Sequence, residues 1–333
     1  MADMELYQQL AATLGLGESP LAPQMFQELV DENGVKILLA ASPPATVEEI
    51  VEKTGLKIDE INKQIDPLFK KGLLFKSRKP DATRYYRFRH FLQFHDATSV
   101  AKDVPQGFLN LLREFKKTEW PDFQDKMKNI LPRPPMRVIP VNVTINPETR
   151  ILAFDDIKQI VEEAGNIAVT RCACRVIDGS CGKPLEVCVQ LNKAADYAVE
   201  RGTGRKVTKQ EALEIFRLCE EEGLVHVAGN RRSLGHVVCN CCEDCCIGWS
   251  ATKEGVKKAI APSRFTAYVD PSLCTSCETC LTRCFFDAVS LEGEDDTALV
   301  DPEKCMGCGV CLVTCQGQAI SMNETRQEEF IPA

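Results

Sequence analysis

The sequence predicts a multidomain protein of the α+β class, and three observations lead to this prediction. The chain has 333 residues, enough for two or three domains, and its hydrophobic fraction of 44% is enough for their cores. In the middle of the chain, segments expected to be strands are interleaved with segments of helical periodicity. Ten of the 18 cysteines lie in this middle part, and the other eight lie beyond it. We therefore divide the chain into residues 1–95, 96–137, 138–262 and 263–333.

Residues 1–95 are expected to form a winged-helix-like domain. Thr46 and Glu49 form a capping-box sequence that begins a helix, and Gly55 ends this helix. A second helical segment follows, and then two strands joined by a turn at 79–81. Helix, turn, helix and a two-stranded wing are the parts of a DNA-binding helix-turn-helix module.

Two functions compete for this domain, DNA binding and protein docking. Residues 68–90 contain eight Lys or Arg and one acid, which is typical of a phosphate-binding surface. The second helix, which would enter the major groove, carries Asp59, Glu60 and Asp66, and Pro67 interrupts it. Acids on such a helix would repel phosphates. We therefore favour a docking domain over a DNA-binding domain.

Residues 96–137 are expected to be a helical and Pro-rich connector. An amphipathic helix is predicted from Phe108 to Lys117. Trp120-Pro121 and the run LPRPP at 131–135 are expected to break helical structure, because proline removes a backbone donor. Pro-rich segments are stiff and extended, so we place a domain boundary here and assign it no chemistry.

Residues 138–262 are expected to form a small α+β domain rich in cysteine. The predicted strands are Val138–Ile145, Ile167–Thr170, Leu224–Val227 and Val237–Val238, and the predicted helices are Asp155–Glu163, Glu186–Glu200 and Thr208–Glu222. Two groups of cysteines follow the second and the last of these strands. We expect both groups to lie in loops at strand ends.

Nine cysteines of this domain are candidate metal ligands. They are Cys172, Cys174, Cys181, Cys188, Cys239, Cys241, Cys242, Cys245 and Cys246. Nine thiols exceed what packing needs, and crowded thiolates repel one another unless a metal neutralises them. Their spacing is not diagnostic, but all-thiolate sites suit zinc or iron–sulfur clusters. Because further cluster candidates stand downstream and a chain of carriers must be closely spaced, we favour one or two [4Fe–4S] clusters, with zinc as the alternative.

Three neighbouring residues are expected to be structural. Cys219 lies inside a predicted helix and is expected to be a small buried hydrophobe. His226 and His236 flank the second cysteine group, where either could replace a thiolate. For each of them we favour a structural role.

Residues 263–333 contain two cysteine runs of identical spacing. They are Cys274-x2-Cys277-x2-Cys280-x3-Cys284 and Cys305-x2-Cys308-x2-Cys311-x3-Cys315. Three thiolates in a tight loop can bind three irons of a cubane, and the fourth corner is reached by a segment that returns from elsewhere. Zinc knuckles would instead need Cys-x2-Cys pairs separated by a long loop. The runs therefore indicate iron–sulfur clusters.

This part of the chain resembles the two-[4Fe–4S] bacterial-type ferredoxins from Phe265 to Met322. Both runs have the spacing of that family, and Val269–Cys274 recurs as Val300–Cys305 at a spacing of 31 residues. In the family, the fourth cysteine of each run binds the other cluster. The resemblance therefore implies a ferredoxin-like domain with one cluster on Cys274, Cys277, Cys280 and Cys315, and a second on Cys305, Cys308, Cys311 and Cys284.

The chain departs from this family directly after the fourth cysteine of each run. The family usually has proline there, whereas this chain has Phe285 and Gln316. That proline shapes the turn beside the cluster. Its loss is expected to alter the reduction potential or the solvent access of the cluster without removing a ligand.

The middle domain has a second, less specific resemblance. The segment RCACR at 171–175, the turn RGTGR at 201–205 and the segment CNCC at 239–242 are similar to a cysteine-rich domain of multi-cluster ferredoxin-like proteins of anaerobes. This similarity extends from Ile139 to Trp249. It implies further clusters but assigns no ligands.

Composition and motifs indicate the compartment in which the protein is expected to work and the classes of function that have no support. No signal peptide and no apolar run as long as a membrane span is evident. Eighteen cysteines without a secretory signal are typical of metal ligation, so we expect a reducing cytoplasm, and low-potential clusters suit an anaerobe. No Rossmann or Gly-Lys-Ser/Thr phosphate motif is present, so NAD or ATP binding has no support.

The acidic charge is concentrated at the C-terminal end. From Ser263 onward there are 12 Asp or Glu and 4 Lys or Arg, so this tail accounts for the chain's net charge of −8. Such an acidic surface is expected to steer a redox partner that has a basic docking site.

Together these features predict a multi-cluster iron–sulfur electron-transfer protein, either a carrier or a subunit of a low-potential cytoplasmic oxidoreductase complex. One alternative is a redox-sensing winged-helix transcription regulator. Another is a reductase whose active cluster lies in the middle domain. We expect an electron-transfer protein or subunit in preference to a stand-alone enzyme, and we assign no catalytic residue.

Overall fold

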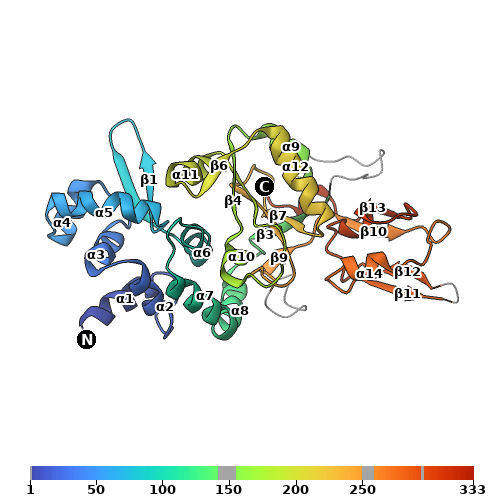
Figure 1. Cartoon of the computed structure of the whole chain (residues 1–333), viewed down its shortest axis with the longest axis horizontal. Helices are drawn as coiled ribbons and strands as arrows, with labels where there is room; N and C mark the ends of the chain where they lie inside the picture. The colour runs from blue at the N-terminus through green and yellow to red at the C-terminus, as the bar shows by residue number, and fades with distance from the viewer. Residues whose placement is uncertain (1, 142–154, 250–258, 294–295) are drawn as a thin grey trace. The chain divides into compact units, whose positions relative to one another are not determined.

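The computed structural model describes residues 2–141, 155–249, 259–293 and 296–333 (Figure 1). The chain divides into two compact units. The first unit comprises Met1–Pro121, Arg171–Gly179 and Val199–Gly204, and the second comprises Asp122–Thr170, Ser180–Ala198 and Arg205–Ala333.

The first unit begins with five helices and a β-hairpin. They are α1 (Ala2–Ala12), α2 (Ala22–Leu29), α3 (Glu32–Ala40), α4 (Val47–Thr54), α5 (Ile58–Lys70), β1 (Leu74–Arg78) and β2 (Thr83–Arg87). The capping box that begins α4 is present, since the Thr46 hydroxyl accepts from the Glu49 amide and the Glu49 carboxylate accepts from the Thr46 amide. Gly55 ends this helix with a left-handed conformation. The helices and the hairpin predicted for this segment are thus present in the predicted order.

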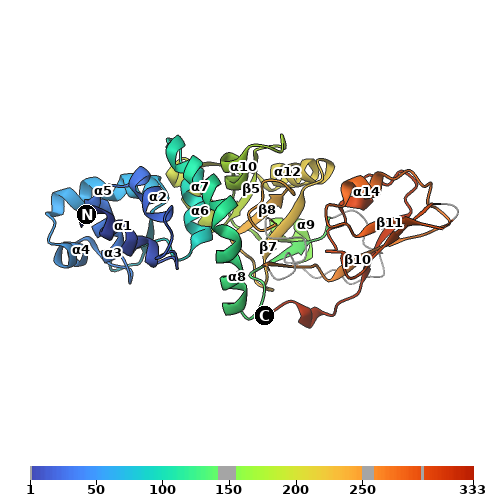
Figure 2. The same ribbon diagram turned by 90° about the horizontal axis from the view of Figure 1, so that it is seen from below.

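Aromatic packing joins the next helices of the first unit. These are α6 (Phe91–Ser99) and α7 (Gln106–Thr118), which lie side by side in Figure 2. The rings of Phe91 and Phe115 are 5.0 Å apart, and those of Phe94 and Phe108 are 5.8 Å apart. The unit also contains α10 (Ala173–Asp178).

One prediction for the connector was wrong. Trp120-Pro121 was expected to break helical structure, but a further helix, α8, covers Trp120–Ile130. Pro121 is the second residue of α8, and the first turn of a helix tolerates proline because its amide has no intrahelical acceptor there.

The second unit is built on a seven-stranded sheet. Its order is β6-β4-β5-β8-β7-β3-β9, with β3 (Met136–Ile139), β4 (Ile167–Arg171), β5 (Glu186–Leu191), β6 (Gly204–Lys206), β7 (Val225–Gly229), β8 (Val237–Cys241) and β9 (Ile260–Ala261). Neighbours β5, β8, β7 and β3 pair in antiparallel fashion, and β9 pairs with β3 in parallel. Of the strand predicted for 138–145, the segment 142–145 lies outside the described residues.

The two faces of this sheet bury different kinds of side chain. Helices α9 (Ile157–Glu163) and α12 (Lys209–Glu221) lie beside each other in Figure 1 and cover one face, where Val238 joins an aliphatic core. Because successive strand residues point to opposite faces, Cys239 and Cys241 of β8 belong to a second core on the other face.

The helix predicted from Glu186 to Glu200 was also wrong. Glu186–Leu191 is strand β5, and helix α11 begins only at Lys193 and ends at Arg201. Val187, Val189 and Leu191 alternate with less buried residues, which is the pattern of a half-buried strand. The alternating pattern is short, begins at the acidic Glu186 and is followed closely by helix α11, so the sequence did not reveal the strand.

The C-terminal part of the second unit forms two small sheets. Strands β10 (Phe265–Val269) and β13 (Ile320–Glu324) pair in antiparallel fashion, as do β11 (Val289–Glu292) and β12 (Thr297–Val300). Short helices α14 (Thr279–Arg283) and α15 (Val310–Val313) each lie within a cysteine run, and the 3-10 helix η3 (Glu328–Phe330) follows.

A buried ionic network joins the seven-stranded sheet to this C-terminal part. Asp155 accepts from Arg137 at 3.1 Å and from Arg264 at 2.6 Å, and Arg264 also contacts Glu324 at 2.5 Å. Asp155 and both arginines are each 1% exposed, so the charges have lost nearly all of their hydration. Burial raises the pKa of Asp155 and lowers that of Arg137 to about 10, while each ion pair opposes these shifts. The Asp155 carboxylate therefore stabilises the positive charges of both buried arginines.

We expect Asp155→Ala to lower the free energy of unfolding of the second unit by about 3–5 kcal/mol, because two buried guanidinium groups lose their common partner. Denaturant unfolding of the metal-loaded protein measures this effect. The control is Glu162→Ala, which removes an exposed carboxylate from its ion pair with Lys209 and should cost about 1 kcal/mol or less. Equal effects of the two substitutions would contradict the assignment.

Candidate metal centres

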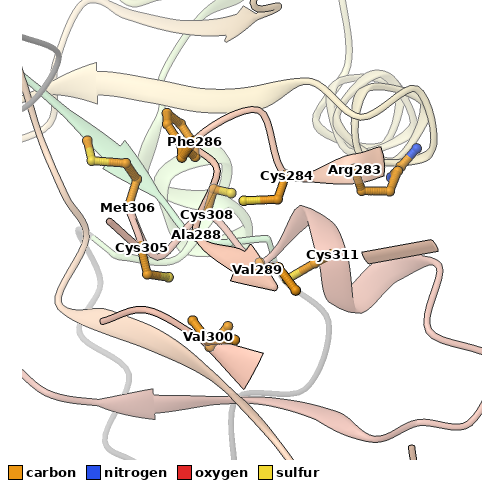
Figure 3. Close-up of a pocket in the computed structure, with 12 residues that line it drawn as sticks. Arg283, Cys284, Phe286, Ala288, Val289, Val300, Cys305, Met306, Cys308 and Cys311 are labelled. Atoms are coloured by element: carbon orange, nitrogen blue, oxygen red, sulfur yellow. The ribbon is translucent and has the colours of Figure 1, made fainter. Parts of the chain in front are cut away.

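Four cysteines surround a pocket in the C-terminal part. Cys305, Cys308 and Cys311 come from the second cysteine run and Cys284 comes from the first (Figure 3). The rest of the lining is mainly apolar and includes Phe286. The structure thus brings together the four residues that the resemblance assigned to one cluster. We call them the second thiol set.

A second pocket is lined by the other four cysteines of the two runs. Cys274, Cys277 and Cys280 come from the first run and Cys315 comes from the second. We call them the first thiol set. In both pockets the donors are soft thiols from two separate segments; the lining of the second set's pocket is mainly apolar, and that of the first set's pocket is mixed. This donor set fits [4Fe–4S] clusters, which Cys thiolates hold.

The backbone of both cysteine loops has residues with positive φ, and at two glycines of the second loop there is no room for a side chain. Gly307 has a φ of +66°, and a Cβ there would lie 2.1 Å from the carbonyl oxygen of Phe265. Gly309 has a φ of +76°, and a Cβ there would lie 2.7 Å from Val141. In the other run, Ser276 and Glu278 have positive φ as well. The loops therefore fold tightly, and the second packs directly against its neighbours.

The two thiol sets differ in exposure. Burial raises the pKa of Cys308 to about 12 and that of Cys311 well above its ordinary value. Cys277 is exposed, and hydrogen bonds from the Thr279 side chain and backbone lower its pKa. The second set is therefore enclosed, whereas the first reaches the surface.

In the middle domain, one group of thiols gathers on the sheet face opposite α9 and α12. Cys239 and Cys246 hydrogen-bond to the Cys241 thiol, and with burial this raises the Cys241 pKa well above its usual value. Val189 of β5 pairs with Val238 of β8. The same antiparallel register places Cys188 opposite Cys239, on the same face, where Cβ atoms are about 4.5–5.5 Å apart. Cys188, Cys239, Cys241 and Cys246 form what we call the sheet-face group.

Three other thiols lie closer together. The sulfur atoms of Cys181, Cys242 and Cys245 are all within 4.8 Å of one another, and the Ser180 hydroxyl is 3.7 Å from the Cys245 sulfur. Zn–S bonds of about 2.3 Å in a tetrahedron place sulfurs about 3.8 Å apart. Among the described residues no other group of three potential ligands is this compact, the eight C-terminal thiols included. The compact triad therefore has the spacing of a single-ion site.

The remaining predicted ligands, Cys172 and Cys174, belong to the first unit. Cys172 precedes the first residue of α10, and Cys174 lies in its first turn. The nine candidates of the middle domain thus fall into the sheet-face group, the compact triad and this pair.

Two of the residues expected to be structural, Cys219 and His226, are fully buried. Cys219 is fully buried in α12. The two ring nitrogens of His226 contact Asn240 at 2.6 Å and Glu220 at 3.3 Å. Because Asn240 points to the face opposite Cys239 and Cys241, we assign His226 no metal.

Several cations of the first unit are paired with acids. Lys76 and Arg78 of β1 both contact Glu200, and Arg84 contacts Glu49. Part of the positive charge that made residues 68–90 resemble a phosphate-binding surface is therefore neutralised within the protein.

No role was predicted from the sequence for three aromatic residues that pack near the thiols. Trp249, Phe285 and Phe286 pack together, with ring centroids 4.4–5.8 Å apart. The sequence feature that could have indicated this aromatic cluster is Phe285, which stands where the ferredoxin family usually has proline.

Comparison with known proteins identifies only the C-terminal part. Residues 266–316 match the family model described as a 4Fe-4S dicluster domain. No curated protein and no solved structure gives a significant match. Among the helices that the structure describes, none combines the length and the hydropathy needed to cross a bilayer. The chain therefore carries a 4Fe-4S dicluster ferredoxin domain near its C-terminus.

Proposed function

We propose that the protein is a multi-cluster iron–sulfur electron-transfer protein, a carrier or a subunit of a low-potential oxidoreductase complex in a reducing cytoplasm. The observation that carries this proposal is the pair of pockets, each lined by four thiols drawn from both cysteine runs. Clusters held by such thiolates accept and donate single electrons.

The ligands of the two clusters follow from the two pockets. The first thiol set would hold cluster one and the second set cluster two, so that each run supplies one ligand to the other cluster. The mainly apolar lining around the second thiol set limits the access of water, and the glycine-containing loop brings Cys305, Cys308 and Cys311 close together.

The redox partner would dock on an acidic surface. Three of the four cations in the tail bond within the protein, since Arg264 contacts Asp155, Arg283 donates to the carbonyls of Glu220 and Glu221, and Arg326 donates to the carbonyl of Ser263. Exposed acids of the tail include Glu278, Asp287, Glu292, Asp296 and Glu303. A partner with a basic docking site would be steered to this surface.

The first unit would dock another protein through a winged-helix-like domain. Its helices and hairpin have the order of that fold, but Lys76, Arg78 and Arg84 contact acids of the unit itself. These pairs favour protein docking over DNA binding.

The compact triad would hold a single zinc ion. Its sulfurs are close enough to share one tetrahedral ion, and Cys242 and Cys245 are buried. Thiolate ligands suit zinc, and the Ser180 hydroxyl lies 3.7 Å from the Cys245 sulfur.

The exchange of ligands between the runs predicts different losses for two double substitutions. Cys274→Ala with Cys315→Ala should remove about four iron per chain, because both thiols serve one [4Fe–4S] cluster. Cys274→Ala with Cys284→Ala should remove about eight iron, because one thiol is lost from each cluster. Anaerobic iron and sulfide analysis with EPR of the reduced protein measures both losses.

Cys219→Ala is the control, since it removes a buried thiol that lines neither of the two cysteine pockets and should leave the iron content unchanged. If each run held its own cluster, the two double variants would give the opposite pattern. Wild-type protein without iron would refute the proposed function itself.

The zinc assignment predicts that Cys242→Ala with Cys245→Ala removes zinc and leaves iron in place. One zinc per chain should be lost, because a compact tetrahedral site holds one ion. Elemental analysis of protein prepared in medium containing both metals measures this. A loss of iron with no loss of zinc would contradict the assignment.

A further inference from the structure

Cys308 of the second thiol set packs against the buried core that holds the thiols of β8 and Cys246. This core contains Cys241 and Cys246 together with Met306 and Val310, and Cys239 and Cys308 pack against it. The Val141 amide, just beyond β3, donates to the Cys308 carbonyl at 2.9 Å. The enclosed pocket of the dicluster domain thus adjoins the cysteine-bearing face of the sheet.

Among the described residues, no member of the first thiol set packs against this core, although the first set shares the neighbouring core with Cys284, Cys305 and Cys311. Cys274, Cys280 and Cys315 pack against the core between the small C-terminal sheets, and Cys277 is exposed. Exposed Leu273 precedes Cys274 directly. Of the two sets, only the second has a member, Cys308, that packs against the core of the middle-domain thiols.

Aromatic rings fill the space where the two groups meet. Phe286 lines the pocket of the second set, and its ring is 5.5 Å from that of Trp249. Phe285 is 5.8 Å from Trp249, which lies in the same core as Cys241 and Cys246. Close packing of these rings excludes water from this region.

Trp249 also carries an unsatisfied donor. Its side chain is 7% exposed, and among the described residues its indole N–H has no acceptor. Buried tryptophans usually find a partner for this group. A metal-bound sulfur is a suitable acceptor, and the thiols of Cys241 and Cys246 are in the same core.

The sheet-face group has the donor set for such a centre. Cys188 and Cys239 lie across two paired strands, and Cys241 is hydrogen-bonded to Cys239 and Cys246. Four thiolates are the ligand complement of a [4Fe–4S] cluster. The group is not as compact as the triad, which fits a cluster better than a single ion.

We propose that Cys188, Cys239, Cys241 and Cys246 hold a third [4Fe–4S] cluster, which exchanges electrons with cluster two across Trp249, Phe285 and Phe286. This proposal rests on the proposed function of the dicluster domain. In the exchange, one electron leaves the reduced cluster, which is oxidised by one unit, and enters the other, which is reduced by one unit. No bond to the protein breaks. Cluster one, at the surface, then serves the external partner, and cluster two serves the middle domain.

The first test compares full-length proteins purified without oxygen. Cys241→Ala with Cys246→Ala should lower the iron content by about four per chain, because one [4Fe–4S] cluster is lost. In EPR of the reduced protein, the signal of cluster two should lose the broadening that a neighbouring spin causes, and the signal of cluster one should not change. Cys219→Ala, the matched control, should keep all of the iron.

The second test keeps every thiol. Trp249→Phe retains the aromatic packing and removes the N–H donor. Because hydrogen bonds to sulfur favour the more negative, reduced state, the potential of the third cluster should become more negative, while that of cluster one stays unchanged. Tyr268→Phe, at an exposed ring of the same unit, should shift no potential.

Each outcome decides the proposal. If the double variant keeps all of its iron while both C-terminal clusters are present, the third cluster is refuted and the proposed function stands. If the third cluster is present but Trp249→Phe shifts no potential, the role of the indole is refuted. Wild-type protein without iron refutes the proposed function before either test.

Discussion

Thiols crowded into apolar surroundings are the constraint on which the rest of the second unit depends. Burial raises the pKa of Cys308 and Cys311, and hydrogen bonds that the Cys241 thiol makes to Cys239 and Cys246, together with burial, raise that of Cys241. Metals bind thiolates, so the ion itself must supply the energy that ionises these groups in a dry site. Folding and metal binding are therefore coupled. Gly307 packs closely against the backbone of Phe265, and the ionic network around Asp155 joins the sheet to the C-terminal part. These contacts fix the arrangement of the cysteine-bearing segments, which the thiols alone would not fix.

The sequence was most informative where the chemistry is local. The two runs place three thiols within seven residues, so their pockets follow from spacing, and the repeat of Val269–Cys274 predicted two similar halves. The grouping of the middle-domain thiols was not local. Cys188 meets Cys239 only through the register of β5 and β8, and β5 itself was mistaken for a helix because its alternating pattern is short and runs directly into α11. Loop proximity along the chain could not show which thiols share a face.

The two departures from the ferredoxin pattern differ in their surroundings. Phe285 packs against Trp249 beside the enclosed second thiol set, whereas Gln316 is exposed beside Cys315 of the first set. A proline at the former position could shape the turn but could not provide an aromatic face. The departure from proline therefore has a packing role beside the second thiol set, and within the part of the chain that the structure describes it has no evident partner beside the first. The two cysteine runs thus have the same spacing of cysteines, but the residues that surround them differ.

This asymmetry extends to charge, and it gives the dicluster domain two distinct ends. Arg283 directly precedes Cys284 and donates to the last carbonyls of α12, where a cation is favoured by the helix dipole. It therefore anchors the second thiol set to the middle domain. Glu278, directly after Cys277, is exposed and lines the other pocket. A cation faces inward beside one set and an anion faces solvent beside the other, so an approaching basic protein is attracted to the set that is already accessible.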